Sequence, residues 1–443
     1  MSVFRPPSFT VPHLRPIAAR RATTVTVLDI GTTKVVCLIG RLTPREESQI
    51  LPGRTHTIEI IGVGHHKSHG VKAGVIVDVE AVESSVRKAV HAAERRAGLT
   101  VESLIVNVSA GRLKSERYTS DLDIGGHEVE SADLKKVLAA AARQISDPQR
   151  VALHSLPVSF RLDGEKSIRD PLGMYGENLG VNMHVLTAEQ PPLRNLELCI
   201  NRSHLTVEAM VATPYASGLS ALVEDEAEIG CACIDMGGGT TTISVFSEGR
   251  MVWADAIALG GHHVTMDLAR GLSTGLEDAE RLKVVHGSAF PVAGDDSDTV
   301  SVPPIGDSDS ETPLQMPKAL VVRIVRARID ETLELIRDRI QRSGYASVVG
   351  RRIVLTGGAS QLTGISDAAR RILSRNVRIG RPLGVAGMPA AAKGPAFATA
   401  VGLMIYPQIA SLESRGNAGR GRYGPVVGGG RLARVGQWLK ESF

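Results

Sequence analysis

The chain has 443 residues, 43% of them hydrophobic, and a formal net charge of +4, a composition typical of a globular protein with a large core rather than of a disordered or fibrous chain. No apolar run reaches the about 18 residues of a membrane-spanning helix, the proline-rich N-terminus is no signal peptide, and so small a net charge excludes nucleic-acid binding as the main function. Four cysteines are too few for a disulfide framework and favour a cytosolic protein.

The charge is concentrated at the two ends of the chain. Residues 1–21 carry +4 and residues 415–443 carry +5, which leaves −5 on the body between them. Residues 1–22 contain four prolines and no acidic residue, and they are predicted to form a disordered basic arm. Residues 415–430 contain seven glycines and are predicted to be a flexible linker.

Runs of β-branched and apolar residues define the first half. Its predicted strands are 23–30, 35–39, 59–63, 75–79 and 104–108, and its predicted helix is 80–97. Residues 31–34 form the turn of a hairpin in this interpretation, and 43–56 form a polar loop. The stretch from about 110 to 185 is predicted to be a small inserted α+β subdomain. It consists of strand-like pieces at 151–156 and 158–162 and an alanine-rich helix at 131–145.

An internal repeat is the most informative feature of the sequence. Residues 25–35 read VTVLDIGTTKV and residues 231–241 read CACIDMGGGTT, so Asp29 aligns with Asp235 and Gly31 with Gly237. Each copy is an apolar strand, an aspartate, a glycine-containing turn and a second strand. The repeat predicts a duplicated domain with a cleft between its halves. Cys231 and Cys233 are predicted to lie on one face of a buried strand, because their spacing is not that of a zinc site.

The second half continues with further strands and helices. The predicted elements are strands at 243–246, 251–259 and 352–356, helices starting at His263 and spanning 276–286, 318–343 and 395–406, and an exposed acidic loop at 291–317 with one short hairpin. The helix 318–343 has an apolar stripe. The stripe comprises Val321, Val325, Ile329, Leu333 and Ile336.

The two aspartate–glycine hairpins have the chemistry of a phosphate site. Glycines allow backbone N–H groups to approach an anion closely, and Lys34 supplies a point charge for a terminal phosphate. Asp29 and Asp235 would repel phosphate, so they are predicted to hold a hydrated Mg²⁺ through water. One such motif alone is equally an ordinary glycine-containing β-turn, but two copies at half-chain spacing favour a clamp on a polyphosphate.

Two further segments are candidates for the nucleoside. Residues 354–359, VLTGGA, form a strand that ends in Gly357-Gly358, where backbone packs flat against a base or ribose. Glu280 and Lys283 are spaced i,i+3 on a helix and are candidates for the ribose hydroxyls and the base edge. A solvated salt bridge is the equally weighted alternative for this pair.

Together these elements resemble the actin-like ATPase superfamily, which includes Hsp70, sugar kinases and bacterial filament proteins. Within it, the chain is most similar to the bacterial cell-division family FtsA. The segments that carry this closer resemblance are 223–230 with 234–240, 278–287, 171–174 and 181–185. The resemblance covers roughly residues 23–410 and the terminal helix. It implies a duplicated, ribonuclease H-like α/β fold with two halves around an ATP cleft.

The resemblance also implies how the chain divides and which residues bind. The implied parts are a first core subdomain, 23–103 with 188–213; an inserted subdomain, 104–187; and a second half, 214–414, with an outer subdomain at about 268–345. The implied phosphate-binding residues are Gly31, Thr32, Thr33, Lys34, Gly237, Gly238, Gly239 and Thr240. The implied adenosine-binding residues are Glu280, Lys283, Gly357, Gly358 and Gln361. The family hydrolyses ATP poorly, and no catalytic base is assigned.

Residues 431–443 read as a basic amphipathic helix suited to an anionic membrane surface. One face carries the apolar side chains Leu432, Val435, Trp438, Leu439 and Phe443. The basic side chains toward the other face are Arg431, Arg434 and Lys440. The alternative is a helix docked on its own body, but a docked helix needs no glycine tether. FtsA proteins resemble this arrangement in having a C-terminal membrane-targeting helix.

Three functions are consistent with these features. The first is a weakly hydrolysing filament scaffold at the inner face of the cytoplasmic membrane. The resemblance to FtsA implies that such a scaffold self-associates, contacts downstream division proteins and binds the C-terminal peptide of tubulin-like FtsZ through its outer subdomain, near 291–317 and Arg328. The second is a small-metabolite kinase, which has no use for an amphipathic tail. The third is an Hsp70-like chaperone, which needs a peptide-binding domain longer than the tail.

Overall fold

The computed structural model describes residues 9–12, 14, 17–18, 20–46, 53–109, 112–290, 297–305 and 313–413. The predicted linker and amphipathic helix lie outside these residues. The arm, predicted to be disordered over residues 1–22, is ordered in part: Val11 and Leu14 are buried in the first core, and the guanidinium of Arg194 lies over the ring of Phe9. Spaced apolar side chains in the arm are buried against apolar surface. The stabilisation from this burial outweighs the tendency to disorder that its prolines and charge predict.

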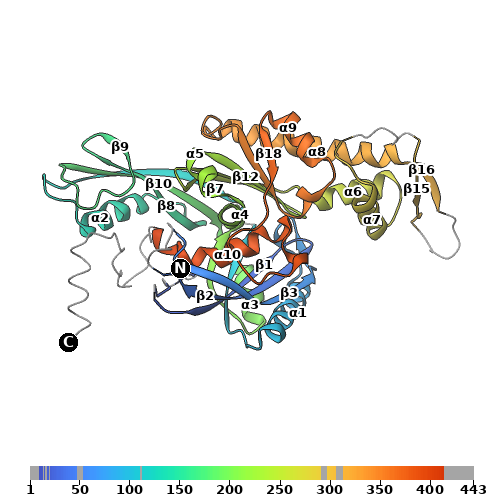
Figure 1. Cartoon of the computed structure of the whole chain (residues 1–443), viewed down its shortest axis with the longest axis horizontal. Coiled ribbons are helices and arrows are strands. Elements are labelled where there is room, and N and C mark those ends of the chain that lie inside the picture. Colours follow the sequence, from blue (N-terminus) through green and yellow to red (C-terminus); the bar gives the residue numbers. More distant parts are fainter. Residues whose placement is uncertain are drawn as a thin grey trace, which may run out of the picture.

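The first half is built on a five-stranded sheet in the order β11-β6-β1-β2-β3, of which β1, β2 and β3 are labelled in Figure 1. Strands β1, β2 and β3 are antiparallel, whereas β6 runs parallel to both β1 and β11. Its elements are β1 (Thr23–Ile30), β2 (Lys34–Pro44), β3 (His56–Lys67), β4 (Val71–Lys72), β5 (Val75–Ile76), α1 (Val79–Ala97), β6 (Ser103–Val108), α3 (Gln190–Arg202) and β11 (Thr206–Ala212).

The predicted strand 75–79 is wrong at its end. Asp78 accepts a hydrogen bond from the backbone N–H of Ala81 at 3.1 Å and so starts α1, which leaves β5 only two residues. The predicted loop 43–56 is also shorter, since β2 extends to Pro44 and β3 starts at His56.

The second half repeats this topology with the order β14-β13-β12-β17-β18. Strand β12 is antiparallel to β13 and parallel to β17, as β1 is to β2 and β6. The elements are α4 (Thr213–Ala221), α5 (Glu224–Ile229), β12 (Cys231–Met236), β13 (Thr241–Ser247), β14 (Arg250–Ile257), β17 (Arg352–Thr356), α9 (Ile365–Leu373), β18 (Asn376–Ile379) and α10 (Ala398–Ile405). The predicted duplication is confirmed, and Cys231 and Cys233 are buried in β12 with free thiols.

The inserted subdomain has its own sheet and core and projects from one end of the molecule (Figure 1). Its elements are β7 (Lys114–Asp123), α2 (Ser131–Ala142), β8 (Arg150–Leu162), β9 (Glu165–Ile168) and β10 (Asn178–Glu189), with sheet order β7-β10-β8-β9. The two predicted strand pieces are one strand, β8, because a register irregularity next to Pro157 interrupts it without ending it. Helix α2 ends three residues earlier than predicted.

The outer subdomain projects at the opposite end (Figure 1). It comprises α6 (Gly261–Gly271), α7 (Leu276–His286), β15 (Thr299–Val302), β16 (Leu314–Pro317) and α8 (Lys318–Arg342). The predicted short hairpin is confirmed by the pairing of β15 with β16, and all five residues of the predicted apolar stripe on α8 are buried.

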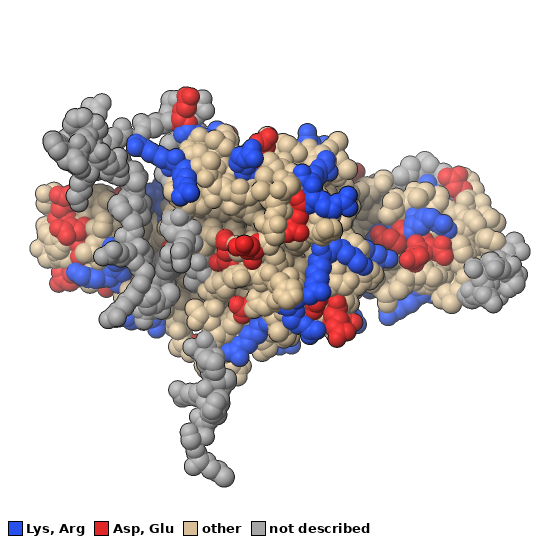
Figure 2. All heavy atoms as spheres, turned by 90° about the horizontal axis from the view of Figure 1, so that it is seen from below, with Lys and Arg blue, Asp and Glu red and all other residues tan. Residues whose placement is uncertain are grey.

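Helices α4 and α10 hold the two halves together beneath the cleft. They pack so closely that a Cβ at Gly402 would overlap with the carbonyl of Ala216, so only glycine fits there. Helix α10 also contacts β1 and helix α4 contacts β12, so the two helices join the sheets of the two halves. On the face shown in Figure 2, acidic and basic side chains are interspersed over the described surface. None of the helices in the described ranges is both long and apolar enough to cross a bilayer.

Candidate functional site

The turns of the two repeated hairpins have the same backbone hydrogen bond. Gly31 N–H donates to the carbonyl of Lys34 at 2.9 Å, and Gly237 N–H donates to the carbonyl of Thr240 at 2.9 Å. The repeat in the sequence is therefore a repeat in local geometry, with each aspartate at the end of its strand and each turn directed out of its sheet.

The two turns meet face to face. A Cβ at Gly238 would lie 2.5 Å from Thr33 Cγ2, and a Cβ at Gly239 would overlap with the hydroxyl of Thr32. Side chains at either glycine would drive the halves apart, so the glycines are required by the contact between the halves as well as by any ligand.

One pocket of about 630 Å³, measured to its open mouth, is lined by both turns. The predicted residues that line it are Asp29, Gly31, Thr32, Thr33, Lys34, Asp235, Gly237, Gly238, Gly239, Thr240, Gly357 and Gly358. The structure thus places all the predicted phosphate and metal residues, and the glycine pair of β17, around one pocket.

The two aspartates are buried at the base of this pocket. Asp29 is 8% exposed and Asp235 is 6% exposed. Burial raises the pKa of Asp29 to about 7, an increase that the charge of Lys34 opposes, and burial also raises the pKa of Asp235. Thr399 Oγ1 donates to Asp235 Oδ2 at 2.8 Å. A nearby cation would stabilise the charged form of these two buried carboxyl groups. They therefore fit a hydrated Mg²⁺ that is bound together with the phosphates.

Lys34 lies in the lining of the same pocket. Its Nζ donates to the carbonyl of Ala396 at 2.5 Å and lies 3.7 Å from the centroid of the Phe397 ring. Burial lowers the pKa of this lysine, whereas Asp29 and Asp235 raise it. An anion in the pocket would compete with the carbonyl and the ring for this ammonium group.

The predicted adenosine residues gather at the start of α6, beside the pocket. Lys283 Nζ lies 2.7 Å from Glu280 Oε2, 3.0 Å from Thr265 Oγ1 and 3.2 Å from the carbonyl of Gly261. Thr265 Oγ1 donates to Glu280 Oε2 at 2.5 Å. The pair is therefore anchored to α6 and is more than a solvated salt bridge.

The glycine pair of β17 lies close to this group. A Cβ at Gly261 would be 3.1 Å from Ala359 Cβ and 3.8 Å from Lys283 Nζ. Gln361 Nε2 donates to the carbonyl of Gly358 at 3.3 Å, which keeps this exposed side chain on the same short segment. The structure brings Glu280 and Lys283 close to the segment that follows β17; Gly357 and Gly358 line the pocket, whereas Glu280, Lys283 and Gln361 lie outside its lining.

Sequence reasoning missed the residues that connect α6 to the second turn. Gly261 N–H donates to the carbonyl of Gly237 at 2.9 Å and His262 N–H donates to that of Gly238 at 2.7 Å. A Cβ at Gly260 would lie 2.5 Å from the carbonyl oxygen of Gly237. The Gly260-Gly261 pair before a predicted helix was the available signal for this contact.

A second missed group comes from β6 and the start of α4. Asn107 Oδ1 accepts from the backbone N–H of Ile30 at 2.7 Å, and its Nδ2 donates to both Ser109 and Thr213 at 3.2 Å. The two hydroxyls are 2.7 Å apart and line the pocket. These residues carry no motif, because only the sheet topology brings them to the pocket.

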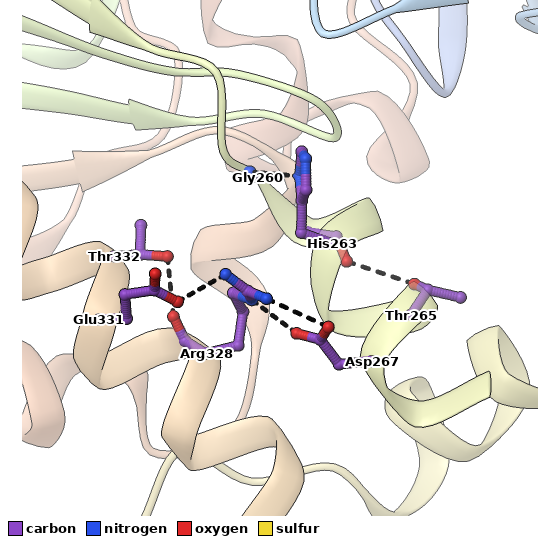
Figure 3. Close-up of polar contacts among 8 residues, drawn as sticks. Gly260, His263, Thr265, Asp267, Arg328, Glu331 and Thr332 are labelled. Atoms are coloured by element: carbon purple, nitrogen blue, oxygen red, sulfur yellow. Dashed lines mark hydrogen bonds and ion pairs between the residues drawn. The ribbon is translucent and has the colours of Figure 1, made fainter. Parts of the chain in front are cut away.

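Arg328 lies on α8, behind α6 (Figure 3). Its Nε and Nη2 donate to the two carboxylate oxygens of Asp267 at 2.5 and 3.1 Å, and its Nη1 donates to Glu331 at 2.5 Å. His263 Nδ1 accepts from the N–H of Gly260 at 3.1 Å and so caps the same helix that carries Asp267. One short helix thus separates the pocket from Arg328.

The sequence of the chain matches family models and relatives among known proteins. The family model for "Cell division protein FtsA" matches residues 232–402, and that for "SHS2 domain inserted in FTSA" matches residues 110–187. The cell division protein FtsA of Rhizobium meliloti (strain 1021) is 70% identical over 443 residues, which are 100% of both chains.

Solved structures resemble the chain in fold. The PilM-PilN type IV pilus biogenesis complex contains a chain with a TM-score of 0.61 and 15% identity, covering 87% of this chain and 98% of that one. MreB5 of Spiroplasma citri bound to ADP gives 0.50 and 14% identity, covering 87% and 96%. At such low identities the likeness concerns the fold alone, which is actin-like.

Proposed function

The chain belongs to the FtsA family of cell division proteins, and from this premise we propose that it is an ATP-binding, actin-like filament protein that links the FtsZ ring to the inner face of the cytoplasmic membrane at the division site. The proposal keeps the expected division into a core subdomain (23–103 with 188–213), an inserted subdomain (104–187) and a second half (214–414). The two matching turns that meet across one pocket are the observation that carries the nucleotide assignment.

In this proposal ATP lies with its phosphates between the two turns. Backbone N–H groups of the glycines and the threonine hydroxyls bind the phosphate oxygens, and Lys34 exchanges its carbonyl partner for a terminal phosphate. Asp29 and Asp235 repel phosphate by like charge, so they would instead hold a hydrated Mg²⁺ through water, whose charge would offset that of the phosphates. The MreB5 structure, which has the same fold, is bound to ADP, and this supports a nucleotide in the cleft of this chain.

The nucleoside end is proposed to rest on the group around α6. Glu280 and Lys283 face it from α7, and Gly357, Gly358 and Gln361 face it from the end of β17. The bound nucleotide then bridges both halves, so its presence stabilises the closed arrangement. Hydrolysis is weak in this proposal, and its role is to regulate assembly.

The partners are proposed to occupy the two projecting ends. The FtsZ C-terminal peptide binds the outer subdomain around Arg328, and the inserted subdomain serves self-association and downstream division proteins. Arg328 offers a cation whose acidic partners, Asp267 and Glu331, are at the surface of the same subdomain. The helix 431–443 binds anionic lipid through its basic and apolar faces.

Two experiments test the proposal. Gly238→Asp places a carboxylate beside the phosphates and Thr33, so binding of Mg·ATP measured by calorimetry should be lost. Gly125→Asp adds the same charge on an exposed turn with no heavy atom within 4 Å and should bind normally. Unchanged ATP affinity in Gly238→Asp would overturn the nucleotide assignment.

Sedimentation with anionic vesicles tests the membrane helix. The full chain should pellet with vesicles that contain phosphatidylglycerol, and a chain that lacks residues 431–443 should remain in the supernatant. Equal pelleting of the two would overturn the membrane assignment. Rapid transfer of phosphate from ATP to a small alcohol would instead favour the kinase.

A further inference from the structure

Four polar side chains gather where β2 ends and β3 begins, at the opposite end of these strands from the first turn of the nucleotide pocket. The backbone N–H of Arg45 donates to the carbonyl of Thr55 at 2.9 Å, and that of His56 donates to Gln408 Oε1 at 2.9 Å. These contacts bring the segments 44–46, 53–56 and 406–409 together. We name Arg45, Arg54, His56 and Gln408 the basal cluster.

Each member of the basal cluster has a buried nitrogen without a hydrogen-bond partner. The four atoms are Arg45 Nε, Arg54 Nη1, His56 Nε2 and Gln408 Nε2. His56 is 1% exposed and Gln408 is 7% exposed, so water does not satisfy these groups from the surface. Six such side-chain atoms occur among the described residues, and four of them are in this cluster. Unsatisfied buried donors are costly, and their concentration in one place points to a missing acceptor.

The cluster also carries uncompensated positive charge. Within the described ranges, neither Arg45 nor Arg54 makes an ion pair; Arg54 only donates Nη2 to the carbonyl of Leu219 at 3.1 Å. Burial lowers the pKa of Arg54, the charge of Arg45 lowers it further, and the charge of Glu224 opposes both. Two guanidinium groups near one another, neither of them in ion-pair contact with a carboxylate of the described residues, are unfavourable unless an anion lies between them.

We propose that the basal cluster binds a phosphoryl group. Two guanidinium groups match the geometry and charge of a phosphate, since each offers a fork of N–H donors and the group carries between one and two negative charges at neutral pH. Gln408 Nε2 adds a donor. His56 Nε2 adds another when the hydroxyl of Thr55 donates to His56 Nδ1, to which it is bonded at 2.8 Å.

The position of the cluster is relevant to the source of this group. Gln408 lies five residues before Glu413, the last described residue, so the cluster is close in sequence to the predicted linker at 415–430. A phosphoryl group here belongs either to a lipid headgroup or to a soluble phosphate compound. The inference stands on the orphan donors and does not depend on the nucleotide assignment.

The test uses the full chain saturated with Mg·ADP, so that the cleft does not compete for phosphate. Orthophosphate is titrated by calorimetry, and binding to phosphatidylglycerol vesicles is compared with binding to phosphatidylcholine vesicles. Arg45→Gln is the main variant, because its side chain has no partner in the described structure and its loss should cost the fold little. Arg54→Lys is the second, because it keeps the charge and loses the fork.

Arg41→Gln is the matched control, since Arg41 lies on β2 four residues before Arg45, is exposed, and only approaches Glu59 at 4.0 Å. Orthophosphate binding that is roughly tenfold weaker or more in Arg45→Gln and Arg54→Lys, but unchanged in Arg41→Gln, supports a soluble source. If the same two variants bind orthophosphate normally and only their binding to phosphatidylglycerol vesicles is weaker, the result supports a lipid source. If both variants behave as Arg41→Gln does in both assays, the proposal is overturned. Failure of ADP to bind counts against the nucleotide assignment alone.

Discussion

His154 and Glu413 are 259 positions apart and form a buried pair in which His154 Nδ1 lies 3.0 Å from Glu413 Oε1. His154 Nε2 accepts the backbone N–H of Ala212 at 2.9 Å, so the proton of the imidazole must be on Nδ1, where it is donated to the carboxylate. The ring also packs edge-on against Tyr215 at 4.9 Å between centroids. The pair joins the inserted subdomain, the first core and the end of the body.

His154→Ala should therefore lower the free energy of unfolding by about 3 kcal/mol, because it leaves a buried carboxylate and a buried N–H without partners. Urea unfolding followed by circular dichroism measures this. His127→Ala is the control, because His127 also bonds to a carboxylate, that of Asp133, but is half exposed. Equal effects of the two substitutions would contradict a structural role for the junction at His154.

Gly239→Ala should separate the two turns of the cleft. The added Cβ overlaps with the hydroxyl of Thr32, so closure around the phosphates is lost and ATP affinity should fall roughly tenfold or more. Gly275→Ala is the matched control, because its Cβ would meet nothing closer than 3.5 Å. Calorimetric titration with Mg·ATP distinguishes them, and equal affinities would show that the turns do not need to touch.

Asp29 should make the stability of the nucleotide-free chain depend on pH. Its pKa is raised from 3.8 to about 7 in the folded state by burial, so the folded state binds a proton that the unfolded state releases. Stability should fall as pH rises from about 4 to 7, by up to about 4 kcal/mol, and then level off. Asp29→Asn should remove most of this slope. Thermal unfolding between pH 4 and 8 measures it, and parallel curves for the two proteins would disprove the assignment.

The local chemistry of the cleft was predictable from sequence, whereas its assembly was not. The turns at Gly31 and Gly237 follow from short-range patterns of apolar residues, glycine and threonine, which repeat within eleven residues. Asn107 and Thr213 reach the pocket through β6 and α4, so their role depends on pairings between distant strands. The two strands predicted at 151–156 and 158–162 are the single strand β8, because the proline at the bulge, Pro157, has the sequence signal of a strand end.

At the ends of the chain, too, the sequence does not predict contacts with distant parts of the fold. Charge and proline content predicted a disordered arm, but Val11 and Leu14 find apolar surface that exists only in the folded body. The predictions for the linker and for the helix 431–443 fall outside the described residues and remain predictions.

Arg328→Glu should abolish binding of the FtsZ C-terminal peptide while leaving ATP affinity within about twofold. The substitution reverses the charge that the outer subdomain offers and places a third carboxylate beside Asp267 and Glu331, which repels an acidic peptide. Arg342→Glu, an exposed position in the last turn of the same helix, is the control and should bind the peptide normally. Fluorescence anisotropy with a labelled peptide and calorimetry with Mg·ATP give the two affinities. Loss of both affinities would mean that α6 transmits the change from Arg328 to the pocket, and loss of neither would place the peptide site elsewhere.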